Sequence, residues 1–508
     1  MSYKMIEIPP GNGGQKLSDW LRASGYEIPL DCGGRGVCGK CKVRVAEGNF
    51  PSAEDPLKLL PPDENGDIRA CRALCPDGSA KILLKDMGGQ GLTEFTFVSE
   101  EADGKGVAAA LDIGTTTVAA ALVDRETGRI LDTVSNLNPQ RSYGADVISR
   151  IAAAKDGNLL NLQRQILCAA SDMLTELSER NPQKKPECMA VTGNTTMLHL
   201  FCGISPEGIG TYPFTPAFTD LKELDGQKLS LPVERVILLP SASAFIGSDV
   251  IAGALVCRMR ELSGPSALLD IGTNGEMIVC TGRGSGNKLY AASAAAGPAM
   301  EGANISCGTG GIDGAVCAVL AESFRTIQDK PPCGLCGCGL VDLIASLLDQ
   351  GLLDETGSLT EDAYTLKGSH LSADGQMLSA CSETPIVLTQ QDIREFQLAK
   401  SAIRAGFEAL LAEAGILTEQ LEKVFIAGGL GYYMNIRSAV RTGLLPAEAL
   451  PVIEAVGNSS LAGAAQCLSS SGAISDAVRL ACECEIAELN SSALFNELFI
   501  ENMLFPED

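Results

Sequence analysis

The chain has 508 residues, 45% of them hydrophobic and 20% charged, which is typical of a globular protein with more than one domain. Its formal net charge of −24 argues against nucleic acid or an anionic membrane surface as a partner, because no basic run is present to neutralise phosphates. The N-terminus has no apolar signal segment, and no run of about 18 apolar residues occurs. We therefore expect a cytoplasmic protein whose 19 cysteines are reduced.

Residues 1–84 are predicted to form a small β-rich domain. Strands are predicted at 3–8, 41–46, 68–74 and 80–84. A turn at 11–14 leads into a short amphipathic helix at 15–23, which contains the only tryptophan, Trp20. This order of strand, turn, helix and loop resembles the β-grasp fold of ferredoxins.

The loop 31–41, DCGGRGVCGKC, carries three cysteines, and a fourth follows after 29 more residues; the four are Cys32, Cys38, Cys41 and Cys71. Three thiolates on a Gly-rich loop plus a distant fourth is the way ferredoxins hold a [2Fe–2S] cluster. The spacing C-x5-C-x2-C is one residue longer than the plant-type spacing and resembles the adrenodoxin-like variant. Free thiols or a zinc knuckle are the alternatives, but a zinc site would more often use two C-x2-C hooks, and only one is present.

Cys75 lies four residues after Cys71 and competes with it as the fourth ligand. We prefer Cys71 because it falls inside the predicted strand 68–74. The segment 85–106 has no sustained periodicity and contains several glycines, so it is predicted to be a linker.

One motif occurs twice in the rest of the chain. DIGTTT at 112–117 and DIGTNGE at 270–276 each lie between two short apolar segments that are predicted to be strands. The glycine permits a tight hairpin, and exposed N–H groups and Thr hydroxyls can bind phosphate oxygens. The Asp at each strand end, Asp112 or Asp270, can hold Mg²⁺ through water or orient an attacking water.

Two further segments support a nucleotide site. The predicted strand 423–427 runs into Gly428 and Gly429, where an adenine ring could lie against backbone that has no Cβ. The segment 458–465, NSSLAGAA, is predicted to be a capped helix start with small residues for close packing. Over residues 107–470 these motifs resemble the actin–hexokinase–Hsp70 (ASKHA) superfamily. That resemblance implies two βββαβα lobes with ATP–Mg²⁺ between them.

The expected fold class is therefore α/β and multi-domain, with an N-terminal β-grasp [2Fe–2S] ferredoxin domain and a two-lobed ASKHA ATPase. The expected domains are the ferredoxin domain at 1–84, the linker at 85–106, the first lobe at 107–262, the second lobe at 263–490 and a C-terminal tail at 491–508.

Some stretches remain open. GNTT at 193–196 either lines the nucleotide site or merely caps a helix, and SAAAGPAMEG at 293–302 is too rich in glycine for a plain helix and could border the nucleotide. Asp249 is interpreted as a partner of a helix N-terminus rather than a catalyst. Cys333, Cys336 and Cys338 form a second candidate metal hook that lacks a fourth ligand in the sequence.

Nearly the whole chain resembles the reductive activators of corrinoid proteins, the RACo-like activases. The matching segments are DCGGRGVCGKC, LDIGTTTVAAALVD, SNLNPQRSYGADVISRI, GNTTMLHLF, LLDIGTNGE and FIAGGLG. The chain differs from the pattern of this family in two features: its linker is shorter than in some relatives, and CGCGL has Cys338 where we would expect Ser.

The resemblance implies ATP-dependent transfer of one electron from the cluster to Co(II) of a corrinoid methyl-carrier protein, which regenerates Co(I). A reduced ferredoxin or flavoprotein would supply the electron, and the oligomeric state stays open, a homodimer included. Asp112 and Asp270 would be catalytic. The nucleotide-binding residues would be Gly114, Thr115, Thr116, Thr117, Gly272, Thr273, Asn274, Gly275, Gly428 and Gly429.

Three alternatives remain at this point. An activator of the 2-hydroxyacyl-CoA dehydratase type combines the same ATPase fold with a [4Fe–4S] cluster that bridges a dimer, but it lacks a ferredoxin domain. A small-molecule kinase with a redox-sensing ferredoxin domain would phosphorylate a metabolite. A ferredoxin-like carrier would turn over no ATP.

Overall fold

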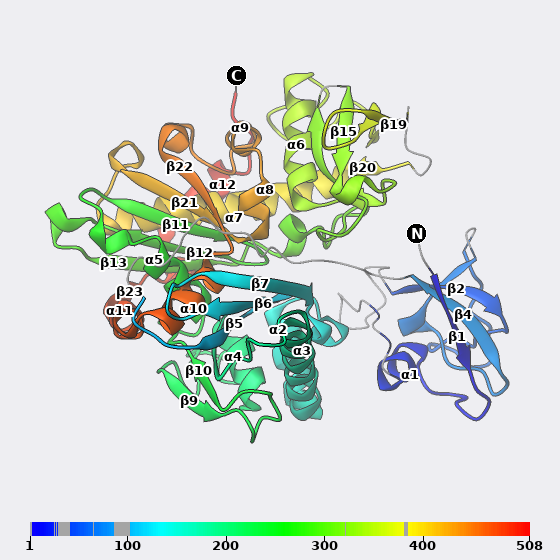
Figure 1. Cartoon of the computed structure of the whole chain (residues 1–508). Helices are drawn as coiled ribbons and strands as arrows, with labels where there is room; N and C mark the ends of the chain where they lie inside the picture. The colour runs from blue at the N-terminus through cyan, green and yellow to red at the C-terminus, as the bar shows by residue number, and fades with distance from the viewer. Residues whose placement is uncertain are drawn as a thin grey trace.

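The computed structural model describes residues 3–24, 26, 28, 41–63, 66–85, 102–320, 322–379 and 385–507. Within them the protein is α/β: a small N-terminal sheet, two six-stranded sheets, a five-stranded sheet and a two-stranded one (Figure 1). Cys32, Cys38 and most of the predicted linker lie outside the described residues. In the part of the chain that is described, no helix is long and apolar enough to cross a membrane.

The N-terminal sheet has the strand order β1-β4-β2-β3, and its described pairs are antiparallel. Its elements are β1 (Tyr3–Ile8), α1 (Leu17–Ala23), β2 (Lys42–Glu47), β3 (Asp67–Arg69), η1 (Ala70–Arg72) and β4 (Ala80–Lys85). The predicted strand 68–74 is wrong beyond Arg69. The chain turns there, because the Ala73 N–H donates back to the Ala70 carbonyl (3.4 Å), and Cys71 lies in this 3₁₀ turn.

One strand pattern occurs twice in the rest of the chain. The sheets have the orders β7-β6-β5-β8-β10-β9 and β22-β21-β11-β12-β13-β23. In each, three antiparallel strands are followed by a strand that pairs in parallel with the first of them: β8 with β5, and β21 with β11. The predicted internal duplication is therefore confirmed as a repeat of topology.

The strands of the first repeat are β5 (Val107–Ile113), β6 (Thr117–Asp124), β7 (Ile130–Leu137), β8 (Cys188–Gly193), β9 (Lys222–Asp225) and β10 (Arg235–Leu238). Those of the second are β11 (Ser266–Ile271), β12 (Gly275–Cys280), β13 (Leu289–Ala294), β21 (Lys423–Ala427), β22 (Ile453–Gly457) and β23 (Cys484–Ile486). The first strands, β5 and β11, are apolar and buried almost throughout, as expected when both faces of a sheet are covered.

Helices cover both faces of these sheets. In the first repeat they are α2 (Val147–Ala153), α3 (Leu159–Arg180), α4 (Thr195–Cys202) and α5 (Ser248–Val256). In the second they are α7 (Gln390–Ala414), α8 (Gly428–Tyr433), α9 (Ile436–Arg441), α10 (Ser459–Ser469), α11 (Ser471–Glu483) and α12 (Ala493–Glu501).

Helices α5 and α10 join the two repeats. Helix α10 contacts α5, β5 and β8, while α5 contacts β11 and β12, so one apolar core takes residues from both sheets. The predicted close packing of this helix is confirmed: a Cβ on Gly463 would lie 2.3 Å from the Ala252 carbonyl oxygen. The two repeats therefore share a buried interface.

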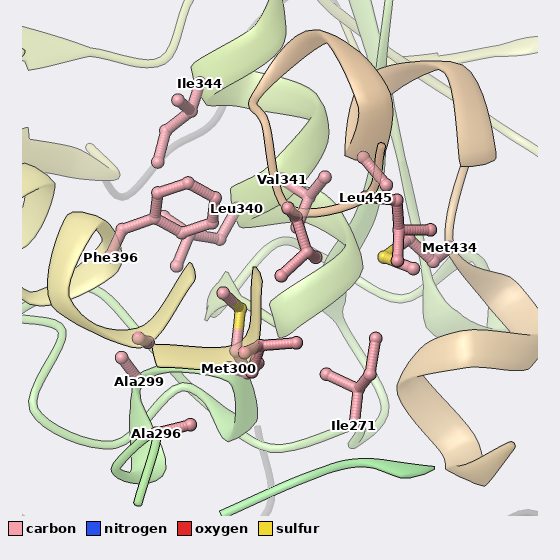
Figure 2. Packing of buried hydrophobic residues seen from close by; sticks show 14 of the residues in the cluster. Ile271, Ala296, Ala299, Met300, Leu340, Val341, Ile344, Phe396, Met434 and Leu445 are labelled. Carbon is pink, nitrogen blue, oxygen red and sulfur yellow. The ribbon is translucent and has the colours of Figure 1, made fainter. Parts of the chain in front are cut away.

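A smaller sheet is inserted in the second repeat between β13 and α7. Its elements, with a two-stranded sheet beside it, are β14 (Ala315–Leu320), β15 (Ser323–Thr326), β16 (Gly334–Leu335), α6 (Gly337–Asp349), β17 (Ala363–Thr365), β18 (Ser369–Leu371), β19 (Met377–Ser379) and β20 (Val387–Thr389). Figure 2 shows Met300 and Ile271 in one apolar cluster with Leu340 and Val341 of α6. The insertion thus packs beneath the second DIGT motif.

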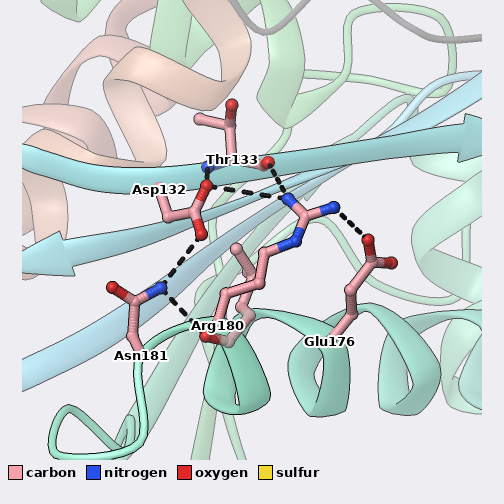
Figure 3. Close-up of polar contacts among 6 residues, drawn as sticks. Asp132, Thr133, Glu176, Arg180 and Asn181 are labelled. Atoms are coloured by element: carbon pink, nitrogen blue, oxygen red, sulfur yellow. Dashed lines mark hydrogen bonds and ion pairs between the residues drawn. The ribbon is translucent and has the colours of Figure 1, made fainter.

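The C-terminal end of α3 is fixed to β7 by polar contacts (Figure 3). Arg180 donates to the Thr133 carbonyl (3.3 Å) and pairs with Asp132 and Glu176. Asn181 donates to the same Asp132 carboxylate (2.9 Å). These contacts hold the long helix against the sheet that carries the first DIGT motif.

The N-terminal sheet contacts the first repeat through α1. The Arg22 guanidinium donates to the Ser142 carbonyl (3.0 Å) and lies 4.6 Å from the centre of the Tyr143 ring. Both partners belong to η2 (Pro139–Tyr143), directly after β7. One arginine therefore connects the cysteine-bearing domain to the segment beside the first DIGT motif.

The C-terminal residues are held on α7 by Lys400, whose buried ammonium donates to the carbonyls of Asn502 (2.7 Å) and Leu504 (2.5 Å). Burial and the nearby Arg404 lower the pKa of Lys400 to about 7. Unfolded lysine titrates near about 10.4, so between these values the unfolded state binds more protons and stability rises with pH.

We therefore expect Lys400→Met to remove a gain in stability that the native protein shows above pH 7. The unfolding temperature of the variant minus that of the native protein should become more negative by roughly 2 °C or more between pH 6 and pH 9. The exposed Lys228→Met is the control and should show no such trend. A difference that is constant with pH would contradict the assignment.

Candidate functional site

The first hairpin, residues 107–124, presents Asp112 near the end of β5. Its carboxylate accepts hydrogen bonds from Asn458 Nδ2 (2.9 Å) and Ser460 Oγ (2.7 Å), which lie at the N-terminus of α10. Two donors from the second repeat thus hold the side chain in place. This position is fixed by contacts across more than 340 residues of sequence.

The loop of the first hairpin is held from three sides. Asn138 Nδ2 donates to the Gly114 carbonyl (2.8 Å), and Asn194 Nδ2 donates to Thr115 Oγ1 (3.2 Å). The fully buried Arg150 donates to the Thr115 carbonyl. Asn194 also accepts from the Met197 N–H (3.0 Å) as the cap of α4. The interpretation of GNTT as a helix cap is confirmed, and the segment also contacts the loop of the first hairpin.

The second hairpin, residues 266–280, places Asp270 of β11 directly opposite Glu276 of β12. Asn274 Nδ2 donates to Glu276 (3.3 Å), which holds that side chain beside the loop. The hydroxyl of Thr273 is buried and has no hydrogen-bond partner among the residues that the structure describes. A buried orphan hydroxyl is costly unless a ligand satisfies it, so this loop is suited to receive a polar group.

The segment after β21 meets the second hairpin at Gly428. This residue has φ +82°, and a Cβ there would lie 2.6 Å from Asp270 Oδ1. Backbone therefore approaches the carboxylate more closely than any side chain would allow. Gly428 and Gly429 are the first residues of α8.

Four carboxyl groups share this region, and their pKa values are raised. Burial, then the charge of Asp112, then that of Glu301 raise the pKa of Asp270 to about 7. Burial, with Asp270 and Asp112, raises the pKa of Asp249 to about 8. Burial also raises the pKa values of Asp112 and Glu276. Burial therefore makes these carboxyls easier to protonate than exposed ones.

Glu301 connects the two hairpins. It ends the short helix η6 (Pro298–Glu301), in the Gly-rich stretch after β13. Thr116 Oγ1 of the first hairpin donates to Glu301 Oε2, and the Thr273 N–H of the second donates to Glu301 Oε1 (3.1 Å). The loops of the two DIGT motifs therefore face one another across a single carboxylate.

In the N-terminal domain, Cys41 Sγ lies 3.2 Å from Cys71 Sγ. The two residues are 1% and 3% exposed, so one metal ion could contact both sulfurs away from solvent. Cys75 is fully buried, and burial raises the pKa of its thiol to about 11. Among the described cysteines, the Cys41–Cys71 pair therefore fits an iron–sulfur cluster.

Three family descriptions match consecutive parts of the chain. They are the "2Fe-2S iron-sulfur cluster binding domain" at 4–75, the "RACo middle region" at 107–262 and the "C-terminal domain of RACo the ASKHA domain" at 265–508. The chain is 32% identical to the corrinoid activation enzyme RamQ of Eubacterium limosum, over 97% of this chain and 96% of that protein. The chain belongs to the RACo family of reductive activators of corrinoid proteins.

Two further relatives agree with this assignment to the RACo family. The [Co(II) methylated amine-specific corrinoid protein] reductase of Methanosarcina barkeri is 27% identical over 73% of this chain and 72% of that protein. The solved structure of a reductive activator for corrinoid, iron–sulfur protein has a TM-score of 0.69 and 26% identity, over 99% of this chain and 96% of that one. The predicted fold, a [2Fe–2S] ferredoxin domain joined to an ASKHA domain, is confirmed.

Some residues of this RACo site were missed or interpreted differently from the sequence. Asp249 does lie in the first turn of α5, as expected, but the charge of Asp270 also raises the pKa of its carboxyl. The roles of Arg150, Glu276 and Glu301 were not anticipated. The position of Glu276 could have been predicted from the sequence, because a hairpin that closes at residues 272–274 pairs Glu276 with Asp270.

The second candidate metal hook, at Cys333, Cys336 and Cys338, does not form a metal site among the described residues. Among them, no group of three or more His, Cys, Asp or Glu side chains could hold a metal ion, the segment of Cys333, Cys336 and Cys338 included. Cys338 Sγ instead donates to the Leu430 carbonyl in α8 (3.4 Å), and Cys336 is the N-cap of α6.

Proposed function

We propose that this chain carries out ATP-dependent reductive activation of a corrinoid protein: one electron passes from its [2Fe–2S] cluster to Co(II) and regenerates Co(I) for methyl transfer. Two sites on one chain support this: a shielded pair of cysteine sulfurs 3.2 Å apart, and two DIGT hairpins whose loops share one carboxylate. The family relationship gives the class of partner, a corrinoid methyl-carrier protein. A reduced ferredoxin or flavoprotein is the proposed donor.

Cys41 and Cys71, together with Cys32 and Cys38, which precede them in the sequence, are the proposed ligands of the cluster. When bound, the cluster supplies a one-electron carrier at low potential, near about −400 mV for plant-type centres. Each further 59 mV or so of mismatch makes a one-electron step tenfold less favourable, so a cobalt acceptor of lower potential requires an energy source. We assign that role to the nucleotide.

The two hairpins are the proposed phosphate sites, with Gly114–Thr117 of the first and Gly272–Gly275 of the second around the phosphates. The Thr116 hydroxyl, the Thr273 N–H and the orphan Thr273 hydroxyl are donors suited to phosphate oxygens. Asp112 and Asp270 are the proposed catalytic residues. Mg²⁺ commonly binds through one or two carboxylates, waters and phosphate oxygens, which needs no cage of three protein ligands.

We assign each role to one of the expected domains: the electron carrier is residues 1–84, the linker 85–106, the two lobes 107–262 and 263–490, and the tail 491–508. ATP can drive the transfer only if it binds one state of the complex better than another. The shared α5–α10 core is a candidate for the part that couples the lobes, because it contacts both sheets.

The direct test mixes the reduced protein with a candidate Co(II) corrinoid protein under anaerobic conditions, with and without Mg–ATP. We expect the absorption band of Co(I) to appear only with ATP. Equal formation of Co(I) without nucleotide would contradict the ATP dependence. Phosphorylation of a small molecule, with turnover indifferent to the corrinoid protein, would favour a kinase instead.

Substitution of Gly428 by alanine should weaken ATP binding by about tenfold or more, because the new Cβ collides with Asp270 Oδ1. The measurement is calorimetric titration with Mg–ATP. The matched control is Gly415→Ala, at a similar φ of +68° but with open space around the Cβ position. It carries the same backbone cost of about 1–2 kcal/mol and should bind ATP normally. Equal losses in both variants would mean that strain alone, and not the contact with Asp270, matters.

A further inference from the structure

Glu301 occupies donors that a phosphate would need. A backbone N–H and a threonine hydroxyl each have a single proton to donate. In this structure the Thr273 N–H and the Thr116 hydroxyl both donate to the Glu301 carboxylate. An anionic ligand that is to accept from either group must therefore displace this side chain.

The carboxylate lies close to the hairpin backbone and to other acids. A Cβ on Gly272 would be 3.1 Å from Glu301 Oε1, so the oxygen is positioned against the main chain of the second loop. Its charge also contributes to the raised pKa of Asp270. A phosphate beside Asp270 and Glu301 together would meet two negative charges, which favours departure of the movable one.

The segment that carries Glu301 is packed in the core at Met300 but has space around Gly297. Met300 lies in the apolar core with Val341 and Met434 (Figure 2), and its carbonyl would be 1.9 Å from a Cβ on Gly337. Before η6, Gly297 has φ +78°, and apart from its chain neighbours no atom of the described residues lies within 4 Å of its Cβ position. A small rotation of the Glu301 side chain or of the turn can therefore break the contacts with the hairpins without disturbing the core.

We propose that Glu301 is a competitor for the phosphates of ATP: it joins the two hairpin loops when nucleotide is absent, and it is released when ATP binds. Release frees the donors on both loops and converts phosphate binding into a movement of the η6 segment beside α6. This inference rests on the proposed function, in which the two hairpins bind ATP. It makes Glu301 a positioning residue that reports whether nucleotide is present.

The test measures affinities for Mg–ATP and for adenosine in the native full-length protein, Glu301→Gln and Glu301→Ala. We expect ATP to bind about tenfold more tightly to both variants, the order expected when charge-assisted hydrogen bonds no longer compete. Adenosine has no phosphate, so its affinity should be unchanged. The control Glu126→Gln removes an exposed charge from the turn after β6, and ATP should bind to it as to the native protein.

Hydrogen exchange supplies a second readout. In the native protein, ATP should increase amide exchange several-fold in residues 298–306, whereas in Glu301→Ala the exchange should be high before ATP is added and change little. If the native protein binds ATP but both variants bind it equally well or more weakly, the proposed role of Glu301 is overturned and the proposed function is not. Failure of the unsubstituted protein to bind ATP would instead contradict the proposed function, and this inference with it.

Discussion

Substitution of Asp270 by alanine should reduce ATP-dependent formation of Co(I) by at least about a hundredfold while leaving the absorption spectrum of the cluster intact. Asp270 faces Glu276 across the second hairpin, lies against the backbone of Gly428 and interacts with the charge of Asp112. Within β11 (Ser266–Ile271), Asp270 is the sole acidic residue. Its loss should therefore remove one of the two groups proposed to handle Mg²⁺ and water.

The control for this variant is Asp362→Asn, which changes an exposed acid in the inserted region of the same lobe. It should retain native activity. The measurement is the initial rate of Co(I) formation under saturating Mg–ATP, with the visible spectrum of the cluster recorded in the same sample. If Asp270→Ala retained full activity, Asp270 would have no part in the mechanism.

Substitution of Cys71 by serine should remove the cluster. Cys71 Sγ is 3.2 Å from Cys41 Sγ, and both side chains are shielded from solvent. We expect the iron content per chain to fall close to zero, the signal of the reduced cluster in electron paramagnetic resonance to disappear, and Co(I) formation to stop. ATP binding should persist, because the hairpins lie in other domains.

Cys75→Ser is the matched control for Cys71, since it removes a thiol four positions away in the same core. We propose Cys71 rather than Cys75 as the ligand because Cys71 Sγ lies 3.2 Å from Cys41 Sγ. This variant should retain its iron, although a hydroxyl in a buried site should lower its stability. Loss of the cluster in Cys75→Ser and retention in Cys71→Ser would reverse the assignment.

The features that the sequence predicted well are local. The two DIGT motifs, their flanking apolar strands and the glycine after β21 each depend on fewer than ten consecutive residues, and the structure places them in equivalent positions of two sheets. The cap at Asn458 was predicted for the same reason, since an Asn before a helix satisfies its free N–H groups.

The features that the sequence did not predict depend on distant contacts. Glu301 lies in a Gly-rich stretch without periodicity, so its link between Thr116 and Thr273 becomes visible only when both hairpins are folded. The turn around Cys71 was mistaken for a strand because its alternating apolar residues resemble one. The contact of Arg22 with η2 spans 120 positions and has no local signature.

The hydrogen bonds from Asn458 and Ser460 to Asp112 have a consequence for synthesis on the ribosome. These donors follow Asp112 by 346 and 348 residues, which at typical elongation rates corresponds to roughly 20–70 s. During that interval the nascent chain carries its first hairpin without the groups that position its acid. Newly made protein should therefore complete the proposed nucleotide site only when translation of α10 is complete.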